Sequence, residues 1–278
     1  MKKTSPAYII SDDSPEARQE RVREKLQKET LSFNQSTGDL DGYDCIECKN
    51  RGFFMEIVPL GNNLYTKMVP CECQKIRRSK TNLERSGLSD FLKEKTFDNF
   101  KTKNQWQLDL KNRAMEYVEN PDNKWLYVGG MSGIGKTHIC SAVYTALINK
   151  GYSPRYFRWR DEINRVKAVV NDWDAYSDIV KKLKYCDLLY IDDLFWTGRN
   201  QDGTKAMPTT ADMNFAFEIL DYRYLQKSKI TIISSELNTT SLFGVDPAIA
   251  GRIKERCGKY MLSFRDDPQQ NYRRQELF

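Results

Sequence analysis

Short apolar runs alternate with longer, helix-like segments from Lys124 onward in this 278-residue chain. The apolar runs are WLYV, PRYFRW, DLLYI, KITIIS and KYMLSF. Strands that alternate with helices along a chain form a parallel sheet that is covered by helices. The pattern therefore predicts an α/β domain with five parallel strands, which we assign to residues 104–278.

The N-terminal part of the chain has a much weaker apolar pattern. We expect residues 1–42 to form a charged helical segment, because a helix can begin at Ser14-Pro15. Only Val22 and Leu26 offer an apolar stripe, so this helix requires a partner surface for its stability. Residues 76–103 include the basic segment KIRRSKTNLERSGLSDFLKEK, which we interpret as a helical linker.

The net charge and the N-terminal sequence exclude only a few classes of protein. The chain has 44 lysines and arginines against 38 acids, a net charge of +6, which favours a polyanionic partner without requiring one. The N-terminal sequence MKKTSPAYIISDD has too short an apolar patch for a signal peptide or a membrane span. We therefore expect a cytoplasmic protein with no membrane partner.

A glycine-rich turn follows the first predicted strand and precedes a helix-like segment. The sequence GGMSGIGKT fits the phosphate-loop pattern G-x-x-x-x-G-K-[ST] in that context. Backbone N–H groups of such a loop surround phosphates, its lysine reaches the β- and γ-phosphates, and its threonine hydroxyl binds Mg²⁺. A glycine turn with an incidental lysine is a much weaker alternative. The sequence predicts ATP and Mg²⁺ as ligands of Gly130, Ser132, Gly133, Gly135, Lys136 and Thr137.

The run Leu188–Ile191 is a candidate buried strand that ends in two acids. Ligands of open α/β sheets bind at the carboxyl ends of strands, so Asp192 is placed to hold Mg²⁺ through water. Asp193 is placed to polarise an attacking water, although it is one methylene shorter than the glutamate that often has this role. The alternative is a solvated turn. The candidate strand PRYFRW lies between the phosphate loop and these acids in the sequence. In P-loop proteins that carry a strand between the phosphate-loop strand and the acidic strand, the catalytic acid can directly follow the aspartate that holds Mg²⁺.

The candidate strand KITIIS is followed by polar residues. Ser234, Ser235 and Glu236 could contact the γ-phosphate or its water, and a simple turn at the strand end is equally compatible with the sequence. The single histidine, His138, begins the helix after the phosphate loop, and we interpret it as a packing residue.

Two cysteine pairs define a candidate metal module over residues 43–75. CIEC and CEC flank a segment with alternating apolar residues and a turn at Gly61-Asn62-Asn63, which predicts a hairpin. Four thiolates at the base of a hairpin can bind Zn²⁺, and free structural cysteines are the weaker alternative. Cys140, Cys186 and Cys257 are interpreted as small buried residues. The predicted zinc ligands are Cys45, Cys48, Cys71 and Cys73.

The segment RYFRWR interleaves basic and aromatic residues. Such a composition suits base stacking and phosphate neutralisation, so Arg155, Arg158 and Arg160 are candidate DNA contacts. A core strand with charged ends is the alternative for the aromatic residues. The later segment GRIKERCGKY is a second basic cluster, or else a solvated helix face.

Taken together, these motifs resemble the DnaC/DnaI-type bacterial helicase loaders and their phage relatives, which are AAA+ ATPases. The resemblance spans residues 43–278. It rests on the four-cysteine module with its basic linker, followed in order by KTFDNF, GMSGIGKTH, DLLYIDDL, TIISSEL and GRIKER.

The resemblance implies an assembly in which ATP is bound between subunits and an arginine from the neighbour senses the γ-phosphate. The matching residue is Arg252, with Arg256 second. The zinc-bearing unit would bind a hexameric replicative helicase, the AAA+ core would bind single-stranded DNA, and no helical lid would follow the last strand. Glu236 stands where these proteins often have asparagine. A transposition helper of the insertion-sequence type and a nucleotide-gated adaptor with little turnover are the alternatives.

Overall fold

The computed structural model describes residues 14–61, 63–85, 91–92, 94–122, 124–198, 201 and 206–264. The chain divides into two compact units, Met1–Arg77 and Arg78–Phe278. Within the described residues, none of the helices combines the length and apolar character that crossing a membrane requires.

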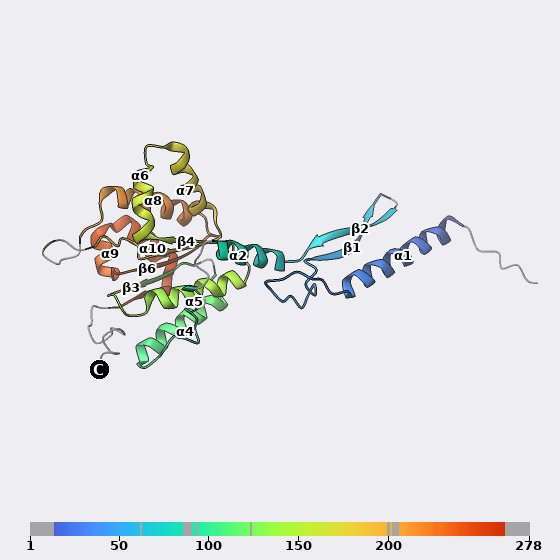
Figure 1. Ribbon diagram of the computed structural model, residues 1–278, viewed down its shortest axis with the longest axis horizontal. Coiled ribbons are helices and arrows are strands. Elements are labelled where there is room, and N and C mark those ends of the chain that lie inside the picture. Colours follow the sequence, from blue (N-terminus) through green and yellow to red (C-terminus); the bar gives the residue numbers. More distant parts are fainter. Residues whose placement is uncertain are drawn as a thin grey trace, which may run out of the picture. The chain divides into compact units, whose positions relative to one another are not determined.

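The first unit consists of helix α1, a hairpin and the start of helix α2. Helix α1 (Pro15–Gln35) begins as predicted, with the Ser14 hydroxyl accepting a hydrogen bond from the Ala17 N–H. This helix, which is described throughout, buries none of its side chains, and it lies alongside the hairpin (Figure 1). The side chain of Asn34 exchanges two hydrogen bonds with the backbone of Met55, at 2.9 and 3.0 Å. The hairpin is therefore the surface that supports this helix.

The predicted hairpin is confirmed. Strands β1 (Phe53–Leu60) and β2 (Asn63–Pro70) pair antiparallel, from Phe53 opposite Pro70 to Leu60 opposite Asn63. Helix α2 (Cys73–Arg85) begins at the last cysteine of the module. Both cysteine pairs therefore lie at the open end of the hairpin, away from its turn.

The second unit contains a five-stranded sheet in the order β4-β5-β6-β3-β7, and every pairing in it is parallel. The predicted five parallel strands are confirmed. Most strand residues are buried because helices cover both faces of the sheet. The strands are β3 (Leu126–Gly129), β4 (Pro154–Arg158), β5 (Leu188–Asp192), β6 (Ile230–Ser235) and β7 (Met261–Ser263).

Two apolar clusters fill the space between the sheet and its helices. One cluster packs α4 (Gln105–Glu119) and α5 (Lys136–Asn149) against the sheet, and Figure 1 shows these helices together on one face. The other cluster packs the remaining long helices against the opposite face. These helices are α6 (Trp159–Ala168), α7 (Trp173–Tyr185), α8 (Thr210–Leu225), α9 (Thr239–Val245) and α10 (Pro247–Cys257), followed by a single 3₁₀ turn at Gly258–Tyr260.

Strand order corrects one sequence interpretation. The strand inserted between the phosphate-loop strand β3 and the acidic strand β5 is β6, whereas PRYFR forms β4 at the edge of the sheet. Proximity in sequence was a poor guide here because parallel strands are joined by crossovers that skip positions in the sheet. The inserted strand β6 therefore brings Ser234 beside the acids on one side of β5, and β4 places Arg158 opposite Asp192 on the other side.

The described part of the expected linker is partly buried. Leu92 and Phe100 are each at most 3% exposed and belong to the cluster that contains α4 and α5. Residues 1–13, and the segment after the last strand on which the expectation of a missing lid depends, lie outside the described residues.

Candidate functional site

The loop between β3 and α5 has the backbone that a phosphate cradle requires. Gly130 and Gly135 have φ of 144° and 87°, a region that side chains with a Cβ rarely adopt. A Cβ on Gly130 would also lie 3.1 Å from the carbonyl oxygen of Phe264. Gly135 is the N-cap of α5, so the first N–H groups of the helix and its positive end face the loop.

Lys136 folds back over this loop. Its ammonium group donates a 2.9 Å hydrogen bond to the carbonyl oxygen of Met131, and the residue is only 5% exposed. A cation held within a ring of backbone N–H groups makes a strong anion receptor. The residues present therefore fit a bound polyphosphate.

A cavity of about 530 Å³ adjoins the loop and gathers most of the predicted nucleotide residues. Gly130 is not part of its lining. Arg158 and Arg160 line it as well, although the sequence predicted DNA contacts for them. The predicted residues that line it are Ser132, Gly133, Gly135, Lys136, Thr137, Asp192, Asp193 and Glu236.

The opposite part of the lining comes from residues to which sequence reasoning gave no site role. Phe91, Lys95, Asn99 and Phe100 precede the α/β core, and the segment KTFDNF was recognised only as a family motif. His138 Nε2 lies 2.8 Å from the carbonyl oxygen of Thr96, and burial lowers the pKa of this imidazole. Its ring also packs edge-on against Phe100, which agrees with the predicted packing role.

Asp192 is a buried carboxylate at the end of β5, 2% exposed. Its Oδ1 accepts hydrogen bonds from the Tyr190 hydroxyl at 2.8 Å, from the Thr137 hydroxyl at 3.1 Å and from the Ser234 hydroxyl. Its Oδ2 accepts one from the Tyr156 hydroxyl at 2.8 Å. Thr137 and Asp192, the two predicted Mg²⁺ residues, are therefore in direct contact and present hard oxygen atoms, which is the donor set that this ion prefers.

Asp193 has an unusual backbone conformation and a side-chain pKa above the ordinary value of an aspartate. Its φ of 59° is rare for a residue other than glycine, and its N–H donates a 3.0 Å hydrogen bond to the Ser234 hydroxyl. Burial, together with the adjacent Asp192 carboxylate, raises the pKa of Asp193 to about 6. A carboxylate with this pKa is still ionised at neutral pH and is more basic than an exposed aspartate.

The polar end of β6 differs from the prediction. Ser234 and Ser235 are fully buried, and their hydroxyls bind Asp192 and the carbonyl oxygen of Leu194 respectively. Neither serine lines the cavity, so neither is placed to touch a γ-phosphate, whereas Glu236 does line it. The serines hold the acidic strand end instead.

The RYFRWR segment separates into a buried aromatic part and charged arginines. Tyr156, Phe157 and Trp159 are at most 6% exposed, so base stacking by them is wrong. The core-strand alternative is confirmed for Tyr156 and Phe157 on β4, whereas the buried Trp159 begins α6. The arginines stay predicted DNA contacts, and each has a partner within the chain. Arg155 pairs with Glu162 at 2.9 Å, Arg158 pairs with Asp161 at 2.9 Å, and the Arg160 guanidinium lies 4.2 Å from the centre of the Trp196 ring.

Arg252 and Arg256, the two arginines that could act on the nucleotide of a neighbouring subunit, have different surroundings. Arg252 binds the Asp221 carboxylate at 2.7 Å, stacks on Phe217 and is not among the residues that line the nucleotide cavity of its own chain. Arg256 is 8% exposed and donates to the carbonyl oxygens of residues 224, 227 and 229. Arg256 therefore holds the segment that follows α8. This structural role disfavours Arg256 as the arginine that acts on a neighbouring subunit.

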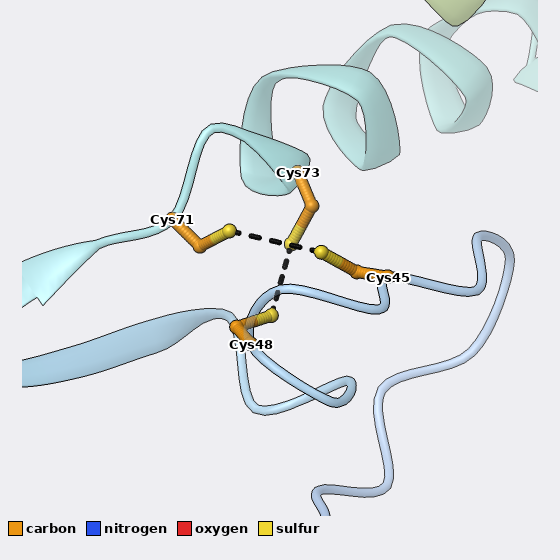
Figure 2. A group of neighbouring side chains, drawn as sticks. All are labelled: Cys45, Cys48, Cys71 and Cys73. Carbon is orange, nitrogen blue, oxygen red and sulfur yellow. Dashed lines mark hydrogen bonds between the residues drawn. The ribbon is translucent and has the colours of Figure 1, made fainter. Parts of the chain in front are cut away.

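The four predicted zinc ligands converge at the base of the hairpin (Figure 2). All four cysteines are buried, and their sulfur atoms lie within 4.8 Å of one another. Sulfur atoms of Cys45 and Cys71 are 3.8 Å apart, and those of Cys48 and Cys73 are 3.5 Å apart. A tetrahedral Zn²⁺ with Zn–S bonds of about 2.3 Å requires sulfur separations of about 3.8 Å. The cluster therefore fits this ion.

Local backbone and acidity also favour a cation at this cluster. Lys49 and Asn50 have positive φ, which turns the chain tightly after Cys48, and the Gly52 N–H donates a 3.2 Å hydrogen bond to the Cys48 sulfur. Burial opposes ionisation of Cys48, but this bond and those from the neighbouring thiols lower its pKa to about 7. Burial raises the pKa of Cys71 to about 12. Four buried thiolates can coexist only if a cation compensates their charge.

We predict that the purified protein contains one Zn²⁺ per chain. Cys48→Ser should lower the zinc content several-fold and destabilise the first unit, because metal binding supplies folding free energy to a module without an apolar core. Elemental analysis and thermal melting measure both effects. Cys186→Ser is the control, since this half-buried cysteine lies in the second unit. Equal zinc content in the Cys48→Ser protein and the unchanged protein would exclude this site.

Two known bacterial proteins have similar sequences. The phage-like element PBSX protein XkdC of Bacillus subtilis (strain 168) is 29% identical over 241 residues, which cover 84% of this chain and 86% of that protein. The chromosomal replication initiator protein DnaA of Bordetella pertussis (strain Tohama I) is 31% identical over 174 residues, 61% of this chain and 34% of DnaA. This chain therefore spans only about a third of DnaA.

Similar folds also occur among solved structures. The alignment with a crystal structure of the DnaC helicase loader covers 61% of this chain and 94% of the loader chain, with a TM-score of 0.45 and 22% sequence identity.

The five-stranded parallel sheet and the phosphate loop agree with the α/β AAA+ core that the sequence resemblance implied. The IstB-like ATP binding protein family matches residues 66–258, which include the phosphate loop, the acidic strand and α10. The chain therefore belongs to the family of IstB-like ATP binding proteins.

Proposed function

We propose that this protein is an ATP-dependent loader that delivers a hexameric replicative DNA helicase onto single-stranded DNA. The observation that carries the proposal is the combination, in one chain, of a nucleotide cavity and a separate unit built around four cysteines. An ATP-binding core can change its assembly with the state of its nucleotide, and a small rigid unit can hold a partner protein. A loader requires both capacities.

ATP hydrolysis is the chemistry that the cavity supports. The loop N–H groups and Lys136 would hold the phosphates, and Thr137 and Asp192 would hold Mg²⁺, which neutralises charge on the phosphates when bound. Asp193 would accept a proton from the attacking water, since its pKa of about 6 leaves it ionised but basic at neutral pH. Its raised pKa partly offsets the shorter side chain, because a stronger base removes the proton more readily.

Arg252 would act on the nucleotide of a neighbouring subunit. The residue lies outside the cavity lining of its own chain and is held by Asp221 at 2.7 Å. A neighbouring cavity could bind this guanidinium only if the triphosphate replaced the carboxylate as its partner. Self-association and ATP binding would then favour one another.

The first unit would bind the helicase through exposed apolar side chains on its hairpin. Tyr65 and Met68 are each 45% exposed. Phe54 of the same hairpin packs against the cysteine cluster and is less exposed. The register places Phe53 and Met68 on one face of the hairpin and Tyr65 on the other, so the apolar side chains do not form a single face. We assign the contact to the face that carries Tyr65.

Single-stranded DNA would bind the second unit. Arg155 and Arg158 form ion pairs that are partly exposed, and phosphate groups could replace the carboxylates. The DnaA relative is named a chromosomal replication initiator protein, which supports a role of this chain in DNA replication.

Two other functions have support of their own. The name of the matching family and a 26% identical relative, a putative insertion sequence ATP-binding protein of Sinorhizobium fredii, favour a transposition helper. Asp193 and Glu236, which depart from the usual residues, favour an adaptor that binds ATP with little turnover. The four-cysteine unit favours the loader over the transposition helper.

We predict that a replicative helicase from the same cell co-purifies with the full-length protein and that its transfer onto single-stranded DNA requires ATP. Tyr65→Ala should reduce the retained helicase about tenfold, as expected for a buried aromatic anchor at an interface. Thr66→Ala is the matched control, because this exposed neighbour points to the other face of the hairpin. Recovery of a transposase instead of a helicase would favour the transposition helper and contradict the loader.

We predict that Lys136→Ala weakens ATP binding at least about tenfold, because a charged hydrogen bond to phosphate contributes about 1.5–3 kcal/mol. The backbone loop is retained, so the thermal melting temperature should change little. Calorimetric titration with ATP measures the affinity, and Lys181→Ala, at an exposed position on α7, serves as the control. Unchanged affinity in a folded Lys136→Ala protein would contradict the nucleotide site.

We predict that Arg252→Ala preserves ATP binding but lowers turnover about 10³-fold, the effect expected of an arginine supplied by a neighbour. Lys254→Ala, two residues away on α10, should retain turnover. In mixtures, Arg252→Ala subunits retain an intact cavity and Lys136→Ala subunits retain the arginine. Mixing the two variants should therefore restore part of the activity, and strict additivity of their separate rates would rule out action between subunits.

A further inference from the structure

Four hydroxyl groups of the described residues surround the Asp192 carboxylate, and they come from four elements of the second unit. Thr137 is on α5, Tyr156 on β4, Tyr190 on β5 and Ser234 on β6. An ionised carboxylate has about four positions for hydrogen-bond donors. Three of these hydroxyls donate to Oδ1 and one donates to Oδ2, so Oδ2 keeps a position open for a further donor such as a metal-bound water.

The two tyrosines are not explained by packing alone. Their rings lie 5.0 Å apart, edge to face, and the ring of Tyr144 packs against both, at 6.3 and 5.6 Å. Phenylalanine would give nearly the same ring contacts, whereas a buried hydroxyl costs free energy unless it has a partner. The partner of both hydroxyls is Asp192, at 2.8 Å in each case.

The two tyrosines bind different oxygens of the same carboxylate. Tyr190 donates to Oδ1 and Tyr156 donates to Oδ2, so together they fix the rotation of the carboxylate about its Cβ–Cγ bond. Thr137 also donates to Oδ1. If the Thr137 hydroxyl turns toward a bound metal ion, the tyrosines and Ser234 still hold the carboxylate in place.

We propose that Tyr156 and Tyr190 are positioning residues that orient Asp192 toward the Mg²⁺ of bound nucleotide. The inference rests on the proposed ATP-binding function and adds to it a role for the edge strand β4. Partners of metal ligands fix ligand orientation, and their loss commonly lowers metal affinity or activity about 10- to 100-fold. Tyr156 thus joins the edge of the sheet to the metal site at its centre.

The test compares three tyrosine-to-phenylalanine variants of the full-length protein. Binding of a fluorescent ATP analogue is titrated with Mg²⁺, and the Mg²⁺ concentration for half-maximal binding is measured along with that for ATP turnover. For Tyr156→Phe and Tyr190→Phe we expect both concentrations to rise about tenfold. Binding measured without Mg²⁺ should be unchanged, because the loop and Lys136 are intact. Tyr144→Phe is the matched control, since it removes a hydroxyl from the same ring cluster that does not bind Asp192.

The outcomes separate this inference from the function on which it rests. A shift of the same size in Tyr144→Phe, or no shift in the other two variants, would overturn the positioning role. If Lys136→Ala binds the analogue normally, the nucleotide site itself is wrong, whatever the tyrosine variants do. Thermal melting checks each protein, and if one of the two positioning variants fails to fold, the other decides the question.

Discussion

The second unit is organised around a carboxylate that is almost completely buried at the edge of the cavity. Asp192 is 2% exposed, and a buried charge is tolerated only when its hydrogen-bonding capacity is satisfied. The donors come from β4, β5, β6 and α5, so the strand order β4-β5-β6-β3 and the position of the phosphate loop are all constrained by one side chain. The same constraint places Asp193 and Glu236 at the edge of the cavity, because each follows a strand that contributes to this network.

The first unit also buries groups that can carry negative charge, but these groups are thiols instead of carboxylates. Among its described residues, the buried cluster contains the four cysteines with Tyr43 and Phe54 packed against them, and α1 buries no side chain. So little apolar surface cannot by itself offset the entropy of ordering the chain. Both units thus bury groups that can carry negative charge, and a cation would complete each of them: Mg²⁺ with nucleotide in the second unit and Zn²⁺ in the first.

The sequence was informative where chemistry depends on local spacing and less so where it depends on strand order. The phosphate loop, the acidic strand end and the convergence of Cys45 with Cys71 follow from short motifs and a hairpin, and the geometry brings these residues together. Tyr156 was interpreted through its arginine neighbours, because nothing local shows that β4 lies beside β5. The lining by Phe100 was missed for the same reason, since it depends on contacts between segments distant in sequence. Tyr65 and Phe53 differ in face because of the hairpin register, which composition does not reveal.

Strand β4 is an edge strand, yet it supplies one of the four hydroxyl donors to Asp192. Arg155 and Arg158 flank Tyr156 on this strand, and both are partly exposed. If a ligand on these arginines shifts the strand, it alters the Tyr156–Asp192 distance and therefore the affinity for Mg²⁺. Thermodynamic linkage makes such an effect reciprocal: nucleotide with its metal would change the affinity of that ligand by the same factor. A single tyrosine hydroxyl would then be enough to couple the outer edge of the sheet to the nucleotide.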